Sequence, residues 1–376
     1  MITVIIGGDV CPTKGDTAYF VGGNVDGIFH DLMDEIRQAD LSLVNLECPL
    51  IDEDHPIAKC GPNLRAPVAA IHALREAGID VLNLANNHIM DHGAPGLECT
   101  LATAQGAGIS TVGAGRNRSE ARKMLIRPVR GIRVGIMGVA EHEFSIATET
   151  KSGANPLDPI DITRHFPTAR ADVDYLIVLL HGGNETYPYP SPRLVDTCRF
   201  FVEQGANAVI CQHSHCIGCY EEYRGAHIVY GQGNLIFDNP RPTSGWNEGV
   251  LVRLHISGDG ASRMELVPYE QSRVGVGARK LPPHDAKMLL QAMAERSANL
   301  VIPGFIEEQW LQFCRKTKHW YLSALLGHGR ILTRLNRHGH LVRLLYPPSA
   351  RSAMLNMIRC EAHREALITI CDEDRS

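Results

Sequence analysis

The chain has 376 residues, of which 44% are hydrophobic and 21% charged, a composition typical of a globular protein with one large domain and an appendage, or with two domains. The formal net charge of -5 gives no reason to expect nucleic acid as a partner, and the sequence has no run of about 18 apolar residues that would predict a transmembrane helix. Eleven cysteines, an odd number without paired spacing, favour reduced thiols in a cytoplasmic protein.

Apolar runs that end in polar loops alternate with helical patterns through the first two-thirds of the chain. The N-terminal run lacks the basic start of a signal peptide, so we expect it to be a strand. Continuous apolar runs, which fit strands covered on both faces, predict strands at residues 2–6, 41–46, 81–84, 134–139, 176–180 and 208–211. Helices are predicted at residues 26–39, 67–77, 96–107 and 192–204. This alternation indicates a layered α/β fold.

After Cys211 the pattern changes to short strands separated by Gly-rich turns. These strands, at residues 227–230, 235–237, 249–256 and 264–268, predict antiparallel sheet. From about Pro282 the pattern is again helical, with spans predicted at residues 285–298, 305–326 and 349–370.

The C-terminal helical region has a local excess of positive charge. No acidic residue lies between Glu308 and Glu361, whereas the basic residues there are Arg315, Lys316, Lys318, Arg330, Arg334, Arg337, Arg343, Arg351 and Arg359. Interleaved Trp, Tyr and Leu residues would make these helices amphipathic. Two interpretations remain open, a solvated basic face and a surface that attracts membrane lipid or another anionic partner.

Polar clusters follow five of the predicted strands at the point where each strand ends. They are Gly7-Gly8-Asp9-Val10-Cys11, Asn45-Leu46-Glu47, Asn86-Asn87-His88, His181-Gly182-Gly183 and His213-Ser214-His215. Ligands in an open α/β sheet gather at the carboxyl ends of strands, so we expect all five clusters to converge on one site. Such polar groups are costly to bury unless they bind something.

The side chains of these clusters form an oxygen and nitrogen set that suits Mn, Zn or Fe. The candidate ligands are Asp9, Glu47, Asn87, His181, His213 and His215. One carboxylate can bridge two divalent ions about 3.5–4 Å apart, and two such ions can hold a hydroxide nucleophile and a phosphoryl oxygen together. His88 would then be free to protonate a leaving group. Each residue alone is more often structural, but their joint occurrence predicts a dimetal site.

The same motifs, in this order, resemble those of the CapA/PgsA-type capsule and poly-γ-glutamate synthesis proteins, a branch of the calcineurin-like metallophosphoesterase superfamily. The resemblance covers about residues 2–270 and includes the segments 83–93 and 231–238. It implies an α/β fold, a four-layer α/β/β/α sandwich of the metallo-dependent phosphatase type. We expect this domain at residues 1–275 and a basic helical C-terminal extension at residues 276–376.

The resemblance also implies roles for the clustered residues. Asp9 and His215 would bind the first ion, Glu47 would bridge, and His88 would be the general acid. The residues that would bind the second ion are Asn87, His181 and His213. Asp91 and His92 are expected to cap the next helix and to orient His88.

One position departs from the superfamily pattern, which has a His two residues after the first Asp. Cys11 stands there in this chain. A thiolate at this position would bind metal and favour zinc, or Cys11 only packs. Two weaker candidates are the segment 141–143, which either brings a carboxylate to the site or is a solvated loop, and Asn234, for which we expect a structural role in a turn.

The resemblance predicts a hydrolase with two divalent metal ions, acting on a phosphoester or an amide bond in capsule, exopolysaccharide or polyglutamate biosynthesis. The alternative is a non-hydrolytic assembly component that uses the metal centre for structure or ligand binding. Family members often begin with a membrane anchor, which is not found here, so we expect a cytoplasmic enzyme, peripheral at the inner membrane. The expected partner is an anionic or phosphate-bearing small molecule or glycan, and the basic helices would contact a membrane or make a homo-oligomer.

Overall fold

The computed structural model describes residues 1–13, 15–239, 241–273, 275–325, 334 and 347–373. Contacts divide the chain into two compact units, Met1–Glu307 and Glu308–Ser376. In the described ranges, no helix has both the length and the apolar character needed to cross a bilayer. The boundary that the sequence predicts after residue 275 would separate two independent domains. This boundary stays a prediction.

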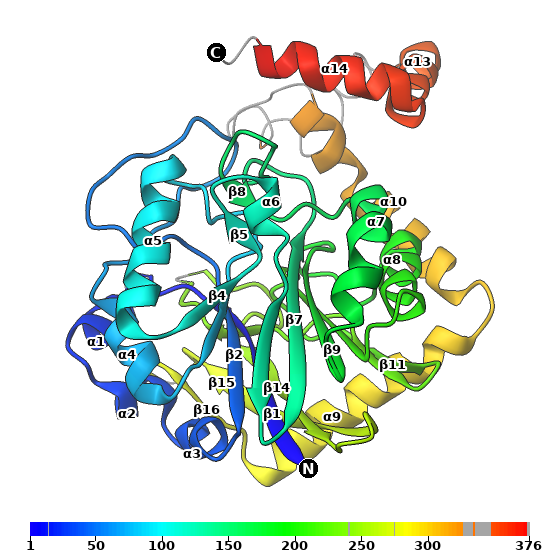
Figure 1. The fold of residues 1–376 in the computed structure, drawn as a ribbon. Helices are drawn as coiled ribbons and strands as arrows, with labels where there is room; N and C mark the ends of the chain where they lie inside the picture. Colours follow the sequence, from blue (N-terminus) through cyan, green and yellow to red (C-terminus); the bar gives the residue numbers. More distant parts are fainter. Residues whose placement is uncertain (14, 240, 274, 326–333, 335–346, 374–376) are drawn as a thin grey trace. The chain divides into compact units, whose positions relative to one another are not determined.

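Two β-sheets form the centre of the first unit (Figure 1). The first sheet has the strand order β16-β15-β14-β1-β2-β3-β4, with β13 paired to β1, and the second has the order β11-β12-β10-β9-β7-β6. The strands of the first sheet are β1 (Ile2–Val10), β2 (Leu41–Leu46), β3 (Val81–Asn83), β4 (Ser110–Val112), β13 (Asn234–Ile236), β14 (Glu248–Ile256), β15 (Ser262–Gln271) and β16 (Ala278–Lys280). Those of the second are β6 (Leu125–Val129), β7 (Ile132–Ala140), β9 (Tyr175–His181), β10 (Ala208–Gln212), β11 (Tyr220–Tyr223) and β12 (Ala226–Val229), while β5 (Ala114–Gly115) and β8 (Gly153–Ala154) pair separately.

The strand directions decide where the polar clusters lie. β1, β2 and β3 run parallel, and so do β7, β9 and β10. The carboxyl ends of each set therefore lie at one edge of their sheet. Since the predicted clusters follow β1, β2, β3, β9 and β10, this topology collects them at two sheet edges.

Alternating side chains along each strand build three apolar cores. Between the sheets, Val4 of β1 lies in one cluster with Ile177 of β9 and Ile210 of β10. On the other face of the first sheet, Ile5 packs in a cluster with the helices from α1 (Thr17–Val21) to α5 (Gly93–Ala107). Phe166 and Phe201 belong to the core between the second sheet and helices α7 (Pro159–Arg170) and α8 (Pro192–Glu203). Figure 1 shows α4 and α5 outside the first sheet and α7 and α8 outside the second. The chain thus has an α/β fold with two sheets whose outer faces are covered by helices.

The helices of the first unit follow the predicted order with local differences. Their bounds are α1 (Thr17–Val21), α2 (Val25–Phe29), α3 (Leu32–Arg37), α4 (Ala70–Ala77), α5 (Gly93–Ala107), α6 (Arg118–Ala121), α7 (Pro159–Arg170), α8 (Pro192–Glu203), α9 (Pro283–Ala298) and the 3-10 helix η1 (Asn299–Val301). The helix predicted at residues 26–39 is two short helices, because His30 takes a φ of 42° between α2 and α3. Gly78 ends α4 with a φ of 94°, as the sequence predicts for a C-cap.

The prediction of antiparallel sheet after Cys211 is confirmed in part. β14 is antiparallel to β15 and β12 is antiparallel to β11, but β12 is also parallel to β10, and β13 is parallel to β1. Short strands between Gly-rich turns do not determine which distant strand they join. The pairing of β13 with β1 matters for the site, since it aligns Asn234 with Asp9.

The C-terminal helices are α10 (Phe305–Leu325), α13 (Pro348–Arg359) and α14 (Glu361–Glu373). The helix predicted at residues 349–370 is interrupted at Cys360, which has a β-region ψ of 117°. Of the predicted basic residues, Arg315, Lys316, Lys318, Arg334, Arg351 and Arg359 are in the described part, whereas Arg330, Arg337 and Arg343 lie outside the described residues.

Candidate metal centre

Five strand ends bring the predicted ligands together. Asp9 lies near the end of β1, where the register with β2 shifts, and Glu47 directly follows β2. His181 is the last residue of β9, and His213 and His215 follow β10. The backbone N–H of His213 donates a hydrogen bond of 3.2 Å to Oδ2 of Asp9, which joins the two sheet edges.

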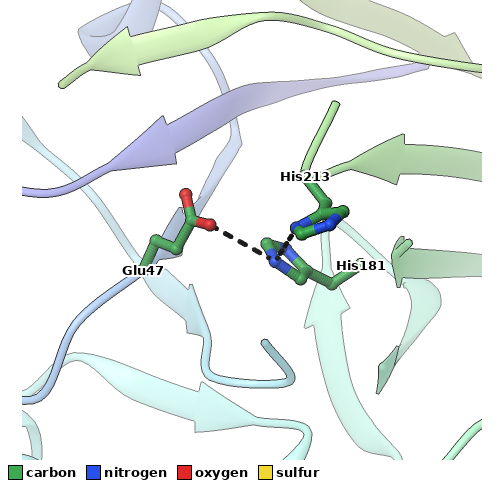
Figure 2. Close-up of side chains that lie close together, drawn as sticks. All are labelled: Glu47, His181 and His213. Atoms are coloured by element: carbon green, nitrogen blue, oxygen red, sulfur yellow. Dashed lines mark hydrogen bonds and ion pairs between the residues drawn. The ribbon is translucent and has the colours of Figure 1, made fainter. Parts of the chain in front are cut away.

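Two groups of side chains have the geometry of a metal site, and they share Glu47. One consists of Glu47, His181 and His213, and the other of Asp9, Glu47 and His215; within each group the ligand atoms lie within 4.8 Å of one another. Figure 2 shows the carboxylate of Glu47 directed at His181, whose Nε2 is 3.4 Å from Oε1 of Glu47 and 3.1 Å from Nδ1 of His213. On the other side, Nε2 of His215 is 3.9 Å from the same Oε1.

The Glu47 carboxylate is the strongest sign that a cation belongs here. Its side chain is fully buried, and neither carboxylate oxygen has a hydrogen-bond partner. Buried polar atoms are almost always satisfied, because leaving a charged group without a partner costs several kcal/mol. Burial and the neighbouring Asp9 raise the pKa of Glu47 well above its usual value. A divalent ion beside Glu47 would satisfy both oxygens and offset this cost, so the residues fit a metal.

The pKa values of Asp9 and of the three imidazoles are also shifted in the direction of the neutral form. Burial raises the pKa of Asp9 to about 6, against the lowering effect of a 2.8 Å hydrogen bond from Nδ2 of Asn45. Burial, with smaller effects of neighbouring imidazoles, lowers the pKa of His213 to about 3 and that of His215 to about 4, and it lowers the pKa of His181 well below its usual value. The imidazoles are therefore neutral at pH 7, which is the form that binds metal.

The segment after β3 contributes Asn87 and His88. Oδ1 of Asn87 lies 3.0 Å from Nε2 of His181, so the amide reaches the group around Glu47. Nδ1 of His88 lies 2.7 Å from Oδ2 of Asp91, and the backbone N–H of His88 donates to Asn86. The structure thus brings Asp91 against His88, which agrees with the predicted orienting role, although α5 begins at Gly93 with no side-chain cap from His92.

A buried lysine completes this arrangement, and sequence reasoning missed it. Lys59 forms an ion pair with Asp91, and its Nζ lies 3.2 Å from Nδ1 of His88. Its side chain is only 3% exposed, although it comes from an otherwise exposed loop. A single Lys in a polar loop gives no signal of this role in one sequence.

Buried amides hold the Asp9 carboxylate in place. Nδ2 of Asn45 donates to Asp9, while Oδ1 of Asn45 accepts hydrogen bonds from Asn83 at 3.1 Å and from Asn86 at 3.2 Å. All three amides are fully buried. This network links the Asn residues at the ends of β2 and β3 to Asp9 near the end of β1.

The backbone at the second sheet edge has an unusual conformation. His213 has a φ of 94° and His215 a φ of 52°, in the left-handed region that non-glycine residues seldom adopt. Such residues cost about 1–3 kcal/mol each and tend to cluster at functional sites. Here both residues belong to the ligand groups.

Three further candidates lie differently around this centre. Cys11 is in neither ligand group. Its buried thiol contacts Cys48, and this contact together with burial raises the pKa of Cys11 well above its usual value. Oε2 of Glu143 lies 3.4 Å from Nδ2 of Asn87, so this carboxylate does reach the site. Glu141 instead accepts from the backbone N–H of Gly183 at 3.1 Å.

Comparisons with known proteins agree with these motifs. A family model described as "Bacterial capsule synthesis protein PGA_cap" matches residues 3–239. The capsule biosynthesis protein CapA of Bacillus anthracis is 29% identical over 65% of this chain and 61% of its own, and the PGA biosynthesis protein CapA of Bacillus subtilis is 28% identical over 65% of each. A probable polyglutamine synthesis accessory protein of Mycobacterium tuberculosis is 29% identical over 54% of this chain and 57% of its own. The chain thus spans less than two thirds of the length of these relatives.

Solved structures resemble the chain only distantly. A hypothetical protein from Thermus thermophilus aligns with a TM-score of 0.46 and 15% identity over 72% of this chain and 99% of that one. Vps29 of Chaetomium thermophilum aligns with a TM-score of 0.24 and 12% identity over 75% and 97%.

Proposed function

The chain belongs to the bacterial capsule synthesis protein family PGA_cap, and we propose that it is a metal-dependent hydrolase of capsule or poly-γ-glutamate biosynthesis. The observation that carries this proposal is the Glu47 carboxylate, which is buried without a hydrogen-bond partner and belongs both to the group with His181 and His213 and to the group with Asp9 and His215. Because Glu47 belongs to both ligand groups, it would be the residue that two divalent ions share. The finer fold assignment, a four-layer α/β/β/α sandwich of the metallo-dependent phosphatase type, belongs to the same proposal and is supported by the three apolar cores.

The two ions would share Glu47. Asp9, Glu47 and His215 would hold the first ion, and Asn87, His181 and His213 would join Glu47 around the second. Two divalent ions supply Lewis acidity toward a phosphoryl or carbonyl oxygen and lower the pKa of a water molecule. Mn, Zn and Fe all suit an oxygen and imidazole set, and Cys11 is not needed as a ligand.

The chain's own residues would handle the proton of the leaving group. Nδ1 of His88 lies 2.7 Å from Oδ2 of Asp91, so in the doubly protonated ring Nδ1–H would donate to Asp91 and the proton on Nε2 would be the one given to the leaving group. Lys59 neutralises Asp91 and fixes its carboxylate beside His88. His88 is close enough to the centre to lower the pKa of His181, His213 and His215.

The proposed substrate is an anionic or phosphate-bearing small molecule or glycan, cleaved at a phosphoester or an amide bond. Both bonds place negative charge on an oxygen that the ions would stabilise. We also propose peripheral contact with the inner membrane from the cytoplasmic side through the basic helices, where Arg315, Lys316 and Lys318 lie on α10. The alternative proposal for the same surface is that these helices form a homo-oligomer.

A non-hydrolytic role in assembly is the second candidate. It is favoured by the low exposure of the candidate ligands, none of which exceeds 8%. A buried metal would then support structure or bind a ligand without turnover.

Turnover by matched variants separates the two. Purified protein is assayed with Mn²⁺ against a panel of phosphoesters and amides, using His88→Ala and, as control, His165→Ala on the outer face of α7. The hydrolase proposal expects a loss of about 10²–10⁴-fold in His88→Ala alone, with unchanged metal content and thermal stability. Equal turnover by both variants, or no turnover by wild type on any compound, would favour the assembly role.

A further inference from the structure

His215 is held in place by residues that are not themselves proposed metal ligands. They belong to β13, to the residue that follows it and to the loop before β14. Its Nδ1 lies 2.8 Å from Oδ1 of Asn234. Its ring packs against Trp246 at a centroid distance of 4.6 Å and meets the edge of Phe237 at 5.4 Å. All of these residues are at most 8% exposed.

The orientation of the Asn234 amide is fixed independently of His215. Nδ2 of Asn234 donates a hydrogen bond of 3.2 Å to the backbone carbonyl of Trp246. The opposite end of the amide, Oδ1, must therefore face His215. Since Oδ1 can only accept, the hydrogen of the imidazole lies on Nδ1. Asp9 does not compete for this hydrogen, because its Oδ2 is 3.6 Å from Nδ1, beyond hydrogen-bond distance.

A further side chain holds Trp246 and Phe237 together. Nε2 of Gln271 donates to both of their backbone carbonyls at 3.1 Å, and Nε1 of Trp246 donates to the carbonyl of Phe237 at 2.7 Å. Gln271 is fully buried. Phe237, Trp246 and Gln271, which lie beside His215, are therefore joined to one another by hydrogen bonds.

The close approach of two glycines makes this contact available. β13 aligns Asn234 with Asp9 of β1, and at this crossing a Cβ on Gly8 would lie 2.0 Å from the carbonyl oxygen of Gly233. Gly233 itself has a φ of 74°. Larger residues at either position would hold β13 away from β1 and move Asn234 away from His215.

We propose that Asn234 and Trp246 are positioning residues that hold His215 as the Nδ1–H tautomer and present its Nε2 to a divalent cation shared with Asp9 and Glu47. This inference rests on the proposed metal centre, but it concerns a property of the protein that exists before any ion binds. Fixing the tautomer and the ring plane removes the reorganisation that ion binding would otherwise require, as hydrogen-bonded partners do for other metal-binding histidines. The role differs from the structural turn expected for Asn234 from the sequence.

The first test measures the tautomer directly in wild-type full-length protein treated with chelator. ¹⁵N-histidine labelling with two-bond N–H correlations reports which ring nitrogen carries the hydrogen, and His215→Ala identifies the signals of His215. The proposal expects the hydrogen on Nδ1, and a hydrogen on Nε2 would overturn it. Absence of hydrolysis, which would contradict the proposed function, leaves this result unaffected.

The second test measures Mn²⁺ binding by competition titration in Asn234→Leu, Asn234→Asp and the control Asn207→Leu, whose amide accepts from the backbone of Leu176 outside the ligand groups. Asn234→Leu removes the acceptor and is expected to weaken one of two Mn²⁺ sites by about 10–100-fold. Asn234→Asp keeps the acceptor toward Nδ1 but loses the donor to the Trp246 carbonyl, so it is expected to lose less affinity than Asn234→Leu. Asn207→Leu is expected to retain both sites. Wild-type affinity in Asn234→Leu, or an equal loss in Asn234→Asp, would contradict the proposal. If Asn234→Leu does not fold, the Mn²⁺ affinity of Asn234→Asp and the tautomer of His215 in wild type test the proposal.

Discussion

Asp9 and His213 are 204 residues apart in sequence, yet the backbone N–H of His213 donates directly to the Asp9 carboxylate. This bond joins the end of β1 in the first sheet to the end of β10 in the second. Because of it, the two ligand groups that share Glu47 are parts of one centre. Changes at either sheet edge should therefore affect both groups.

Replacing Lys59 by Met should destabilise the protein strongly. The substitution leaves the buried carboxylate of Asp91 without its ion pair, which typically costs about 3–5 kcal/mol. Urea unfolding with chelator present measures the change. Lys59→Met/Asp91→Asn, which removes both charges, should regain part of the loss, and a Lys59→Met protein as stable as wild type would contradict the account.

Gly8→Ala should disrupt the metal centre although it adds one methyl group. The new Cβ would lie 2.0 Å from a backbone carbonyl, which β13 can relieve only by moving away from β1. We expect a loss of more than about 3 kcal/mol in stability or loss of the protein from the soluble fraction. The matched control is Gly106→Ala in α5, where nothing lies within 4 Å, and a stabilisation of about 0.5–1 kcal/mol is expected.

Ion affinity should fall between pH 7 and pH 5 because of the carboxylates and not the imidazoles. The pKa of Asp9 is raised to about 6, so below that pH a proton competes with the ion. The pKa values of His213 and His215, about 3 and about 4, leave both rings neutral throughout this range.

The sign of the stability effect is definite for Asp9. Its raised pKa means that, without metal, its contribution to stability is present below about pH 4 and is lost as pH rises through about 6. Bound Mn²⁺ offsets that loss, so the rise in melting temperature on adding Mn²⁺ should be larger at pH 7 than at pH 5. Asp9→Asn should reduce this difference, and an equal Mn²⁺ effect at both pH values would contradict the assignment.

Contact with an anionic membrane should depend on α10. Changing Arg315, Lys316 and Lys318 to Gln removes three charges, each worth about 1 kcal/mol at an anionic surface. Sedimentation with vesicles of mixed neutral and anionic lipid should show binding by wild type that the triple variant loses. Binding that is equal for both proteins, or equal on purely neutral vesicles, would end the membrane proposal, and a change in oligomeric state alone would favour self-association.

The sequence predicted the parts of this molecule that depend on local pattern. The buried parallel strand β9 is a nearly continuous apolar run, and β2 is mostly apolar. Because polar residues lie at the ends of such strands, the convergence of Asp9, Glu47 and His181 followed from one rule about strand ends. The family resemblance added roles that spacing alone does not assign.

What the sequence did not predict depends on long-range pairing. The parallel placement of β13 beside β1, and with it the contact of Asn234 with His215, needs a partner more than 200 residues away. Lys59 reaches Asp91 from an irregular loop, for which no periodicity exists. His30 interrupts the helix predicted at residues 26–39 because it takes a positive φ, which its residue type does not predict.

The most direct test is the metal content of protein purified without chelator, measured by mass spectrometry for wild type, Asp9→Ala, His213→Ala and Glu47→Gln. We expect two equivalents of divalent metal in wild type, about one in Asp9→Ala and in His213→Ala, and less than wild type in Glu47→Gln. A single ion that is insensitive to Asp9→Ala, or no bound metal in wild type even after incubation with Mn²⁺ or Zn²⁺, would contradict the dinuclear centre.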